Sequence, residues 1–384
     1  MRKKEHSGSA AVIGAQLVIL FILTVSLCVQ SRKAAAENTY AVMEKSGEGS
    51  RAGEPEKAGE AGDSQKKKYI HWVEFNVPAD VMEKAFRLDM GTVQEEVHFN
   101  WVELPAYLGA KYGGDFERFR QTDLDAVVEK LKSGAAMEEI TKDMKYYAYY
   151  REAYGAVLDG MVGYFEQESG NNKVWLRKYG LKVFSPIAKN FPYSDYDDFG
   201  ASRSYGFKRK HLGHDMMGQV GTPVIAVESG YVEALGWNQY GGWRVGIRSF
   251  DGKRYYYYAH MRQNRPYHPD VQRGAVVRAG DVIGYVGRTG YSTVENTNNI
   301  TTNHLHIGLE LIFDEAQKDG PNQVWIDLYE LTKFLQQHRS PVVRVADTKE
   351  YYRAVSYSEP DVEAYLRGEL PQPFPSKSES REGS

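Results

Sequence analysis

The sequence of 384 residues contains very little cysteine and no excess of charge of either sign. Its single cysteine, Cys28, excludes a disulfide framework within the chain. The formal net charge is −3, from 48 basic and 51 acidic residues, so bulk electrostatics predict no nucleic-acid partner. The His-Glu-x-x-His helix of one class of zinc peptidases is also absent.

Long hydrophobic runs are scarce, and the longest spans residues 10–29. It follows a basic segment, residues 1–9, whose charges predict a cytoplasmic N-terminus. The run is either a single-pass transmembrane anchor or a cleaved signal sequence. We favour the anchor because the run is longer than a usual signal core, and because Arg32 and Lys33 precede the Ala34–Ala36 stretch that could be cleaved. Both interpretations predict that the remainder is exported.

The next two segments differ in their content of large apolar residues. Residues 30–68 have almost none and predict a flexible linker. Residues 69–170 predict a helical accessory domain, most clearly at Thr122–Gly134. There, apolar residues recur at helical spacing between a potential N-cap, Thr122, and a glycine that ends the helix. Further helical patterns cover Pro78–Phe86, Trp101–Tyr112 and Ala135–Phe165.

The pattern then changes from helices to strands. Residues 171–204 predict an irregular connector, and residues 205–338 an all-β domain built from short strands. Asp251-Gly252 is a strong hairpin signal. Trp325–Gln337 predicts a closing helix, and residues 339–384 a C-terminal tail without pattern. The expected fold class is therefore multidomain: a transmembrane helix, an α-helical accessory domain and an antiparallel β-domain.

Two histidines lie within a strand pattern near the end of the β-domain. Side chains alternate between the faces of a strand, so His304 and His306 are expected to point the same way. Adjacent imidazoles rarely serve packing, because their nitrogens need polar partners. A metal ion or a pair of proton carriers would explain them.

The chain from His211 to Phe313 resembles the lysostaphin-type (LytM-like) zinc metallopeptidases, which cut peptide bonds in bacterial peptidoglycan. The resemblance depends on several motifs in the family's order. They are His-x-Gly-x-Asp at 211–215, Gly-Thr-Pro-Val-x-Ala at 221–226, Tyr-Ala-His at 258–260, the glycine-rich run at 280–290 and His-Leu-His at 304–306.

The resemblance implies a zinc peptidase domain over residues 205–338 that holds one Zn²⁺ per chain. It assigns His211, Asp215 and His306 as the metal ligands, and His260 and His304 as catalytic residues. His304 would accept a proton from water, while His260 would stabilise the oxyanion or share the proton transfer. The neighbouring His214 is expected at the rim or in a structural role. The implied partner is peptidoglycan, and the implied location is the bacterial cell membrane, with the catalytic domain outside the cytoplasm.

Three points stay open in the sequence. Tyr256 and Tyr258 would share a face with His260, so they either line the cleft or pack in the core. Residues 294–303 lengthen the loop before His304 relative to the family, which either narrows substrate choice or partly covers the metal. The alternative to a zinc endopeptidase is a catalytically silent wall-binding or scaffold protein, and an enzyme held inactive by the helical region is a third hypothesis.

Overall fold

The structure is a computed structural model, and it describes residues 70–169, 173–205, 207–318, 320 and 322–373. All of these belong to one compact unit, which begins at Lys68. The predicted basic N-terminus, the apolar run at 10–29 and the linker at 30–68 lie outside the described residues. Within the described ranges, every helix is too short or too polar to cross a membrane.

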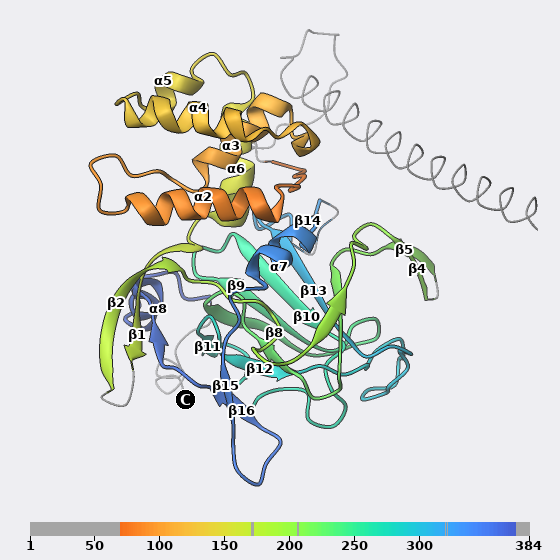
Figure 1. The fold of residues 1–384 in the computed structure, drawn as a ribbon. Helices are drawn as coiled ribbons and strands as arrows, with labels where there is room; N and C mark the ends of the chain where they lie inside the picture. The colour runs from red at the N-terminus through yellow and green to blue at the C-terminus, as the bar shows by residue number, and fades with distance from the viewer. Residues whose placement is uncertain (1–69, 170–172, 206, 319, 321, 374–384) are drawn as a thin grey trace, which may run out of the picture. The chain divides into compact units, whose positions relative to one another are not determined.

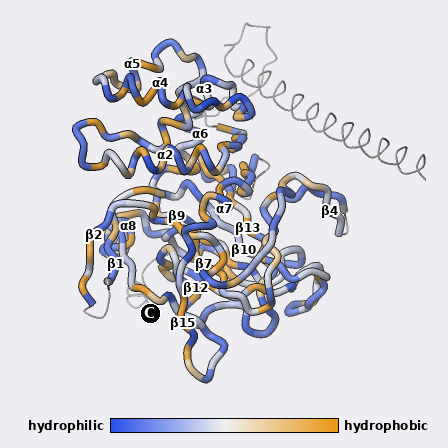
Figure 2. The backbone as a smooth tube through the Cα atoms, in the orientation of Figure 1, coloured by the Kyte–Doolittle hydropathy of each residue, from blue (hydrophilic) through white to orange (hydrophobic). Residues whose placement is uncertain are grey.

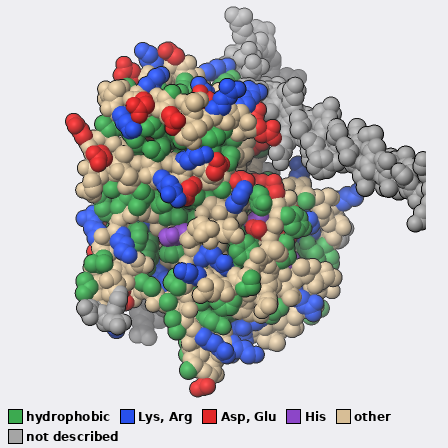
Figure 3. Space-filling view, in the orientation of Figure 1, with side chains coloured by type: hydrophobic (Ala, Val, Ile, Leu, Met, Phe, Trp, Pro, Cys, Tyr) green, Lys and Arg blue, Asp and Glu red, His purple; other side chains and the backbone are tan. Residues whose placement is uncertain are grey.

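The described chain begins with helices, as the sequence predicts (Figure 1). Most of their buried residues are apolar, and apolar and hydrophilic residues alternate along these helices (Figure 2). The face in Figure 3 shows acidic and basic side chains interspersed over these helices. The elements are α2 (Ala79–Thr92), α3 (Glu103–Tyr112), a 3₁₀ turn (Phe116–Arg118), α4 (Gln121–Lys132), α5 (Met137–Thr141) and α6 (Tyr147–Leu158).

Helix α4 confirms the predicted pattern but corrects its cap. Its four buried residues have the predicted helical spacing, and Gly134 follows it with a φ of 92°. However, the helix begins at Gln121, because Arg120 still has extended backbone. Thr122 is therefore inside the first turn and is not the N-cap.

The helical region is shorter than predicted. Helix α6 ends at Leu158, where Gly160 adopts a φ of 82° and turns the chain. An antiparallel hairpin of β1 (Val162–Ser169) and β2 (Val174–Leu181) follows. The helix predicted as far as Phe165 is therefore wrong in its last part, and the irregular segment expected at 171–204 includes ordered strands.

The predicted antiparallel β-domain is confirmed. Its main sheet has the strand order β11-β8-β9-β10-β13-β6-β3, with β14 paired to β13. Strands β4 and β5 form a separate hairpin, and β7 pairs with β12. The bounds are β3 (Tyr193–Asp195), β4 (Ser202–Tyr205), β5 (Phe207–Lys210), β6 (His214–Gly218), β7 (Pro223–Ile225), β8 (Gly230–Asn238), β9 (Gly242–Ser249), β10 (Arg254–Ala259), β11 (Val276–Val277), β12 (Val282–Tyr285), β13 (His304–Leu311) and β14 (Val324–Ile326).

The turn between β9 and β10 contains Asp251-Gly252, as predicted. Gly252 has a φ of 74°. Asp251 is not in the left-handed region; instead, its carboxylate accepts hydrogen bonds from the Lys253 amide (3.1 Å) and the Ser249 hydroxyl (2.6 Å). The side chain of Asp251 thus stabilises a turn longer than two residues.

The C-terminal part differs most from prediction. The closing helix α7 covers only Tyr329–Leu335, because β14 occupies the preceding residues. The predicted patternless tail contains ordered elements, and one of them, β17, pairs with β1. These elements are too short for a periodic pattern to reveal them: β15 (Val342–Arg344), β16 (Tyr351–Arg353), β17 (Tyr357–Ser358) and α8 (Pro360–Leu366).

Candidate metal centre and active site

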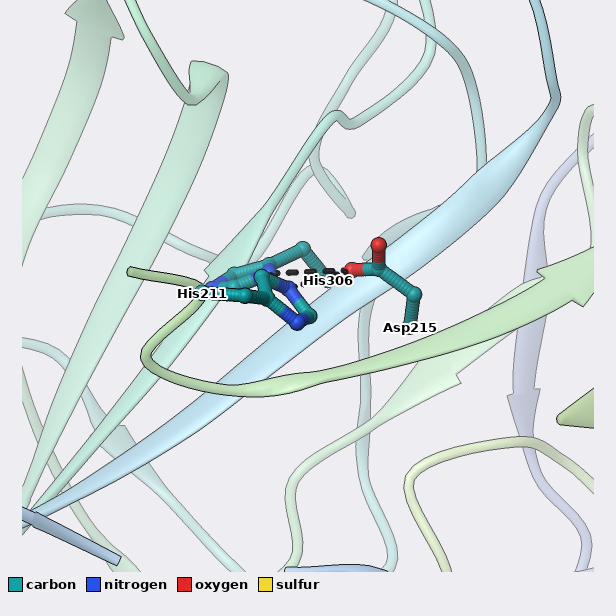
Figure 4. A group of neighbouring side chains, drawn as sticks. All are labelled: His211, Asp215 and His306. Carbon is teal, nitrogen blue, oxygen red and sulfur yellow. Dashed lines mark hydrogen bonds and ion pairs between the residues drawn. The ribbon is translucent and has the colours of Figure 1, made fainter. Parts of the chain in front are cut away.

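Three predicted ligands meet where β6 lies beside β13. His306 pairs with Asp215 in the antiparallel register, and His211 precedes β6 by three residues. His211 Nε2 lies 2.9 Å from His306 Nδ1, and both nitrogens lie 3.0 Å from Asp215 Oδ1. Figure 4 shows the two rings and the carboxylate converging. Within the described residues, this group alone among histidine, cysteine, aspartate and glutamate has metal-ligand geometry.

Gly213 allows this close approach. A Cβ atom at this position would lie 2.5 Å from His306 Cε1, 2.6 Å from Nε2 and 2.7 Å from the Ile307 carbonyl oxygen. Any side chain would therefore displace the His306 ring. The glycine between His211 and Asp215 is required by packing across the two strands.

Residues of the expected connector hold the ligands in place. His211 Nδ1 donates to the Asp198 carbonyl oxygen at 3.1 Å, so Nε2 is the ring nitrogen that faces the group. Arg203 Nη2 donates both to Asp198 Oδ2 (2.6 Å) and to Asp215 Oδ2 (3.2 Å). Sequence reasoning missed Asp198 and Arg203, because no spacing rule links them to the histidines.

The acid–base properties of the three ligands are strongly coupled. Burial opposes protonation of His211, but hydrogen bonds and attraction to Asp198 and Asp215 outweigh it and raise the pKa of His211 to about 9. Burial alone would raise the pKa of Asp215, yet hydrogen bonds from His211 and His306 hold that pKa far below its usual range. Burial also lowers the pKa of His306. Without a metal, His211 is thus protonated at physiological pH and donates its Nε2 proton to the Asp215 carboxylate, and a bound metal would replace that proton.

The two predicted catalytic histidines lie next to the ligands. His304 Nε2 is 3.7 Å from Asp215 Oδ1, which agrees with the shared strand face of His304 and His306. The His260 ring centre lies 4.7 Å from that of His304 and 5.9 Å from that of His306. The structure therefore brings all five predicted site residues together.

Both of these histidines have the same hydrogen-bond arrangement. His304 Nδ1 lies 2.8 Å from the Thr302 carbonyl oxygen, and His260 Nδ1 lies 2.8 Å from that of Thr289. A carbonyl can only accept a hydrogen bond, so each neutral ring carries its proton on Nδ1 and its lone pair on Nε2. Burial and the nearby histidine charges keep the pKa of His260 well below its usual value. His260 is therefore neutral at physiological pH.

The tyrosine alternative is resolved in favour of core packing. Tyr256 and Tyr258 are fully buried, and their hydroxyls contact Glu228 and the Val227 amide. The simple alternation fails because β10 ends at Ala259 and His260 has a φ of 61°. It is Tyr257, on the opposite face, whose ring lies 5.9 Å from that of His306.

His214 has the structural role that was one of the two expected for it. The side chain is buried, and its Nε2 lies 2.9 Å from Asp195 Oδ2 on the neighbouring strand β3. It therefore belongs to the sheet interior and not to the ligand group.

The long loop before His304 is attached to a neighbouring turn. The Asn296 Oδ1 atom accepts hydrogen bonds from Trp243 Nε1 (2.9 Å) and from the Asn264 amide (2.8 Å). Asn298 donates to the side chain of Gln263 at 3.0 Å. The influence of this loop on substrate choice stays a prediction, which shortening the loop would test.

The antiparallel sheet thus brings two histidines and one aspartate, which are donor types found in catalytic zinc sites, beside two further imidazoles. Residues 209–319 match the model of Peptidase family M23, so this segment of the chain is a Peptidase family M23 domain. The resemblance identified from the sequence motifs is thereby confirmed for this segment.

Individual relatives also match segments of the chain. Similarity to the L-Ala--D-Glu endopeptidase of Bacillus subtilis (strain 168) is 36% identity over 124 residues, which is 32% of this chain and 36% of that protein. Lysostaphin of Staphylococcus simulans is 39% identical over 97 residues, 25% of this chain and 17% of that protein. The solved catalytic domain of Staphylococcus simulans lysostaphin is 29% identical and covers 37% of this chain and 92% of that chain, with a TM-score of 0.29. The match thus spans about a third or less of these curated relatives.

Proposed function

We propose that this protein is a zinc-dependent endopeptidase that hydrolyses peptide bonds of bacterial peptidoglycan. The observation that carries the proposal is the convergence of three metal-ligand atoms beside two imidazoles with free Nε2 lone pairs. The Peptidase family M23 match and the similarity to wall-lytic endopeptidases support the same substrate class.

The ligand group suits zinc. Two imidazole nitrogens and one carboxylate oxygen are a usual protein ligand set for catalytic zinc. Their mutual separations of 2.9–3.0 Å are shorter than the ~3.4 Å between tetrahedral ligands at about 2.0–2.2 Å from one ion, so the three side chains would move apart slightly to hold zinc. When bound there, zinc supplies Lewis-acid chemistry that polarises a peptide carbonyl and acidifies water.

His304 is proposed as the proton acceptor. Its Nε2 lone pair faces the ligand group, and its Nδ1 proton is fixed on the Thr302 carbonyl oxygen, so the ring can receive a proton without reorienting. The protonated ring could then donate to the leaving amine. His260 has the same orientation in a more buried position, where its Nε2 lone pair would share the proton transfer with His304.

We also propose export of the catalytic unit, with residues 10–29 as its membrane anchor. This proposal is supported only by the sequence pattern of the basic segment and apolar run. Cell fractionation with an antibody to residues 70–373 would test it: recovery in the cytosolic fraction would reject it, and recovery in the medium would favour a cleaved signal.

The decisive experiment measures new amino groups released from purified peptidoglycan by the full-length protein. We expect release that requires zinc, disappears with a chelator, and is absent from His304→Ala while that variant still binds zinc. His71→Ala, an exposed histidine, is the matched control and should behave as wild type. No release from several wall types, despite one bound zinc per chain, would favour the non-catalytic wall-binding protein.

A further inference from the structure

Beside the metal group, two arginines lie near a tyrosine hydroxyl without a carboxylate partner. They are Arg209 on β5 and Arg244 on β9, and the tyrosine is Tyr257 on β10. In the described part of the chain, neither guanidinium forms an ion pair with a carboxylate. Two arginines so close to a candidate active site call for an explanation, because an uncompensated partly buried charge is unfavourable.

The sheet register places Arg244, Tyr257 and His306 on one face. Tyr257 pairs with Gly246 of β9 and with Gly308 of β13. Arg244 and His306 each lie two residues before these glycines, so both side chains point to the face of Tyr257. The Tyr257 ring lies 5.9 Å from that of His306.

Arg209 lies on the β4–β5 hairpin and contacts two tyrosines, one of which is beside the catalytic histidines. Its guanidinium lies 5.3 Å from the ring centre of Tyr240 and 5.2 Å from that of Tyr291, and its Nη2 donates to the Tyr291 hydroxyl at 2.9 Å. The Tyr291 ring lies 6.0 Å from that of His260. Arg209 is thus connected to the catalytic histidines through Tyr291.

Among the residues that the structure describes, Arg209 and Arg244 each have a nitrogen without a hydrogen-bond partner, and their positive charges are not paired with a carboxylate. Arg209 Nη1 and Arg244 Nε are buried and have no hydrogen-bond partner in the described structure. Burial raises the pKa of Tyr257 to about 12, while the positive charges of Arg244 and Arg209 act against that rise, and no carboxylate contributes. The tyrosine therefore lies in a positive field that the protein leaves unneutralised.

We propose that Arg209 and Arg244 form an anion-binding subsite that selects peptides carrying a free carboxylate next to the scissile bond. A guanidinium matches the planar geometry of a carboxylate better than that of any neutral peptide group. The aromatic rings around Arg209 restrict its motion, so less conformational entropy is lost on binding. The inference depends on the proposed function for its substrate and specifies the chemical class of that substrate.

The test compares two stem peptides that contain the L-Ala–D-Glu bond, one with the free α-carboxyl of D-Glu and one with this group amidated. Calorimetry on zinc-loaded His304→Ala measures binding without turnover. We expect the acid to bind about 10- to 100-fold more tightly than the amide. Adding Arg209→Gln or Arg244→Gln should reduce this ratio at least several-fold, Arg209→Lys should retain part of it, and Arg87→Gln, an exposed arginine on α2, should leave it unchanged.

Equal binding of the two peptides to His304→Ala, or an acid preference that survives both glutamine substitutions, would overturn the subsite. Cleavage of the two peptides by the wild-type protein tests the peptidase proposal separately from the subsite. Cleavage of both peptides at equal rates leaves the peptidase intact and rejects the subsite. Tighter binding of the acid without cleavage of either peptide supports the subsite and counts against the peptidase.

Discussion

Strand β10 has buried polar groups at both ends, and they differ in how their hydrogen-bonding atoms are used. At its start, Arg254 donates to both carboxylate oxygens of Glu228 (2.8 and 2.9 Å), to Asp251 (3.0 Å) and to the Ala156 carbonyl oxygen (3.1 Å). Just beyond its other end, His260 uses only Nδ1, and its Nε2 lone pair remains available beside the ligand group. The Arg254 guanidinium thus donates to acceptors within the protein, whereas the His260 ring keeps an acceptor nitrogen without a protein donor.

This difference distinguishes a structural cluster from a functional one. Polar groups that bond to each other within the protein hold segments of the chain together. The hydrogen bond from Arg254 to the Ala156 carbonyl oxygen, for example, joins the sheet to the end of α6. An acceptor such as His260 Nε2, which has no donor in the protein and lies beside the ligand group, is unfavourable unless a ligand binds. Substitutions should therefore affect stability at one end of β10 and activity at the other.

The largest expected effect is on activity, at the ligand end. His306→Ala removes one of three metal ligands, so we expect loss of stoichiometric zinc and a fall in peptidase kcat/KM of at least ~10³-fold. The free energy of unfolding of the metal-free protein should fall by only ~1–3 kcal/mol, because the His306 ring loses its contacts to Asp215 and His211. Metal analysis and urea unfolding would check both values. Retention of full activity with two protein ligands would contradict the assignment of His306.

The next effect is on stability, at the Arg254 end. Arg254→Met leaves the Glu228 carboxylate buried without its cation, and we expect a loss of ~3–5 kcal/mol in unfolding free energy with little change in zinc content. Adding Glu228→Gln removes the unpaired charge and should recover part of that loss. A double variant as unstable as Arg254→Met would attribute the loss to packing instead.

The sequence predicted the two ends of β10 unequally. His260 belongs to a motif whose partners, His211 and His306, stand in similarly short motifs, so a linear pattern was enough to group them. Arg254 has partners 26 and 98 residues away, at Glu228 and Ala156, and no period or spacing rule connects them. The orientation of His260 was also beyond a pattern of alternating side chains, because its positive φ departs from the strand.

Dependence on distant partners also explains where the predicted fold was wrong. The helices were predictable because their buried residues recur at helical spacing, and the main sheet because short apolar runs end at turn signals. The C-terminal strands of two or three residues are too short to show a period and are stabilised by distant partners, such as β1 for β17. Asp198 and Arg203 were missed because only the folded chain brings them to the ligands.

A smaller effect should come from residues that only orient the ligands. Arg203→Met removes the donor shared by Asp198 and Asp215, and we expect zinc affinity to fall about tenfold. Competition with a chromogenic chelator would measure this change, with exposed Arg87→Met as the matched control. Unchanged affinity would show that the sheet alone fixes the Asp215 carboxylate.

A further effect on stability concerns His338, a half-buried histidine whose Nε2 lacks a hydrogen-bond partner in the described structure. His338 stacks on Phe184 with ring centres 4.5 Å apart. Burial lowers its pKa to about 4, from an ordinary value near 6.5. As the pH falls below 6.5, the unfolded chain gains a proton that the folded protein resists until about pH 4, so stability decreases over this interval.

The difference between these pKa values corresponds to about 3 kcal/mol, and we expect ~2 kcal/mol because the ring keeps some solvent contact. His338→Phe preserves the stack and cannot titrate, so its unfolding free energy should fall less than that of wild type between pH 7 and pH 4.5. Urea unfolding at both pH values gives the comparison. If the two proteins lose the same stability, the acid sensitivity arises from other groups. The free energy of protonating His338 in the folded protein is then smaller than its burial indicates.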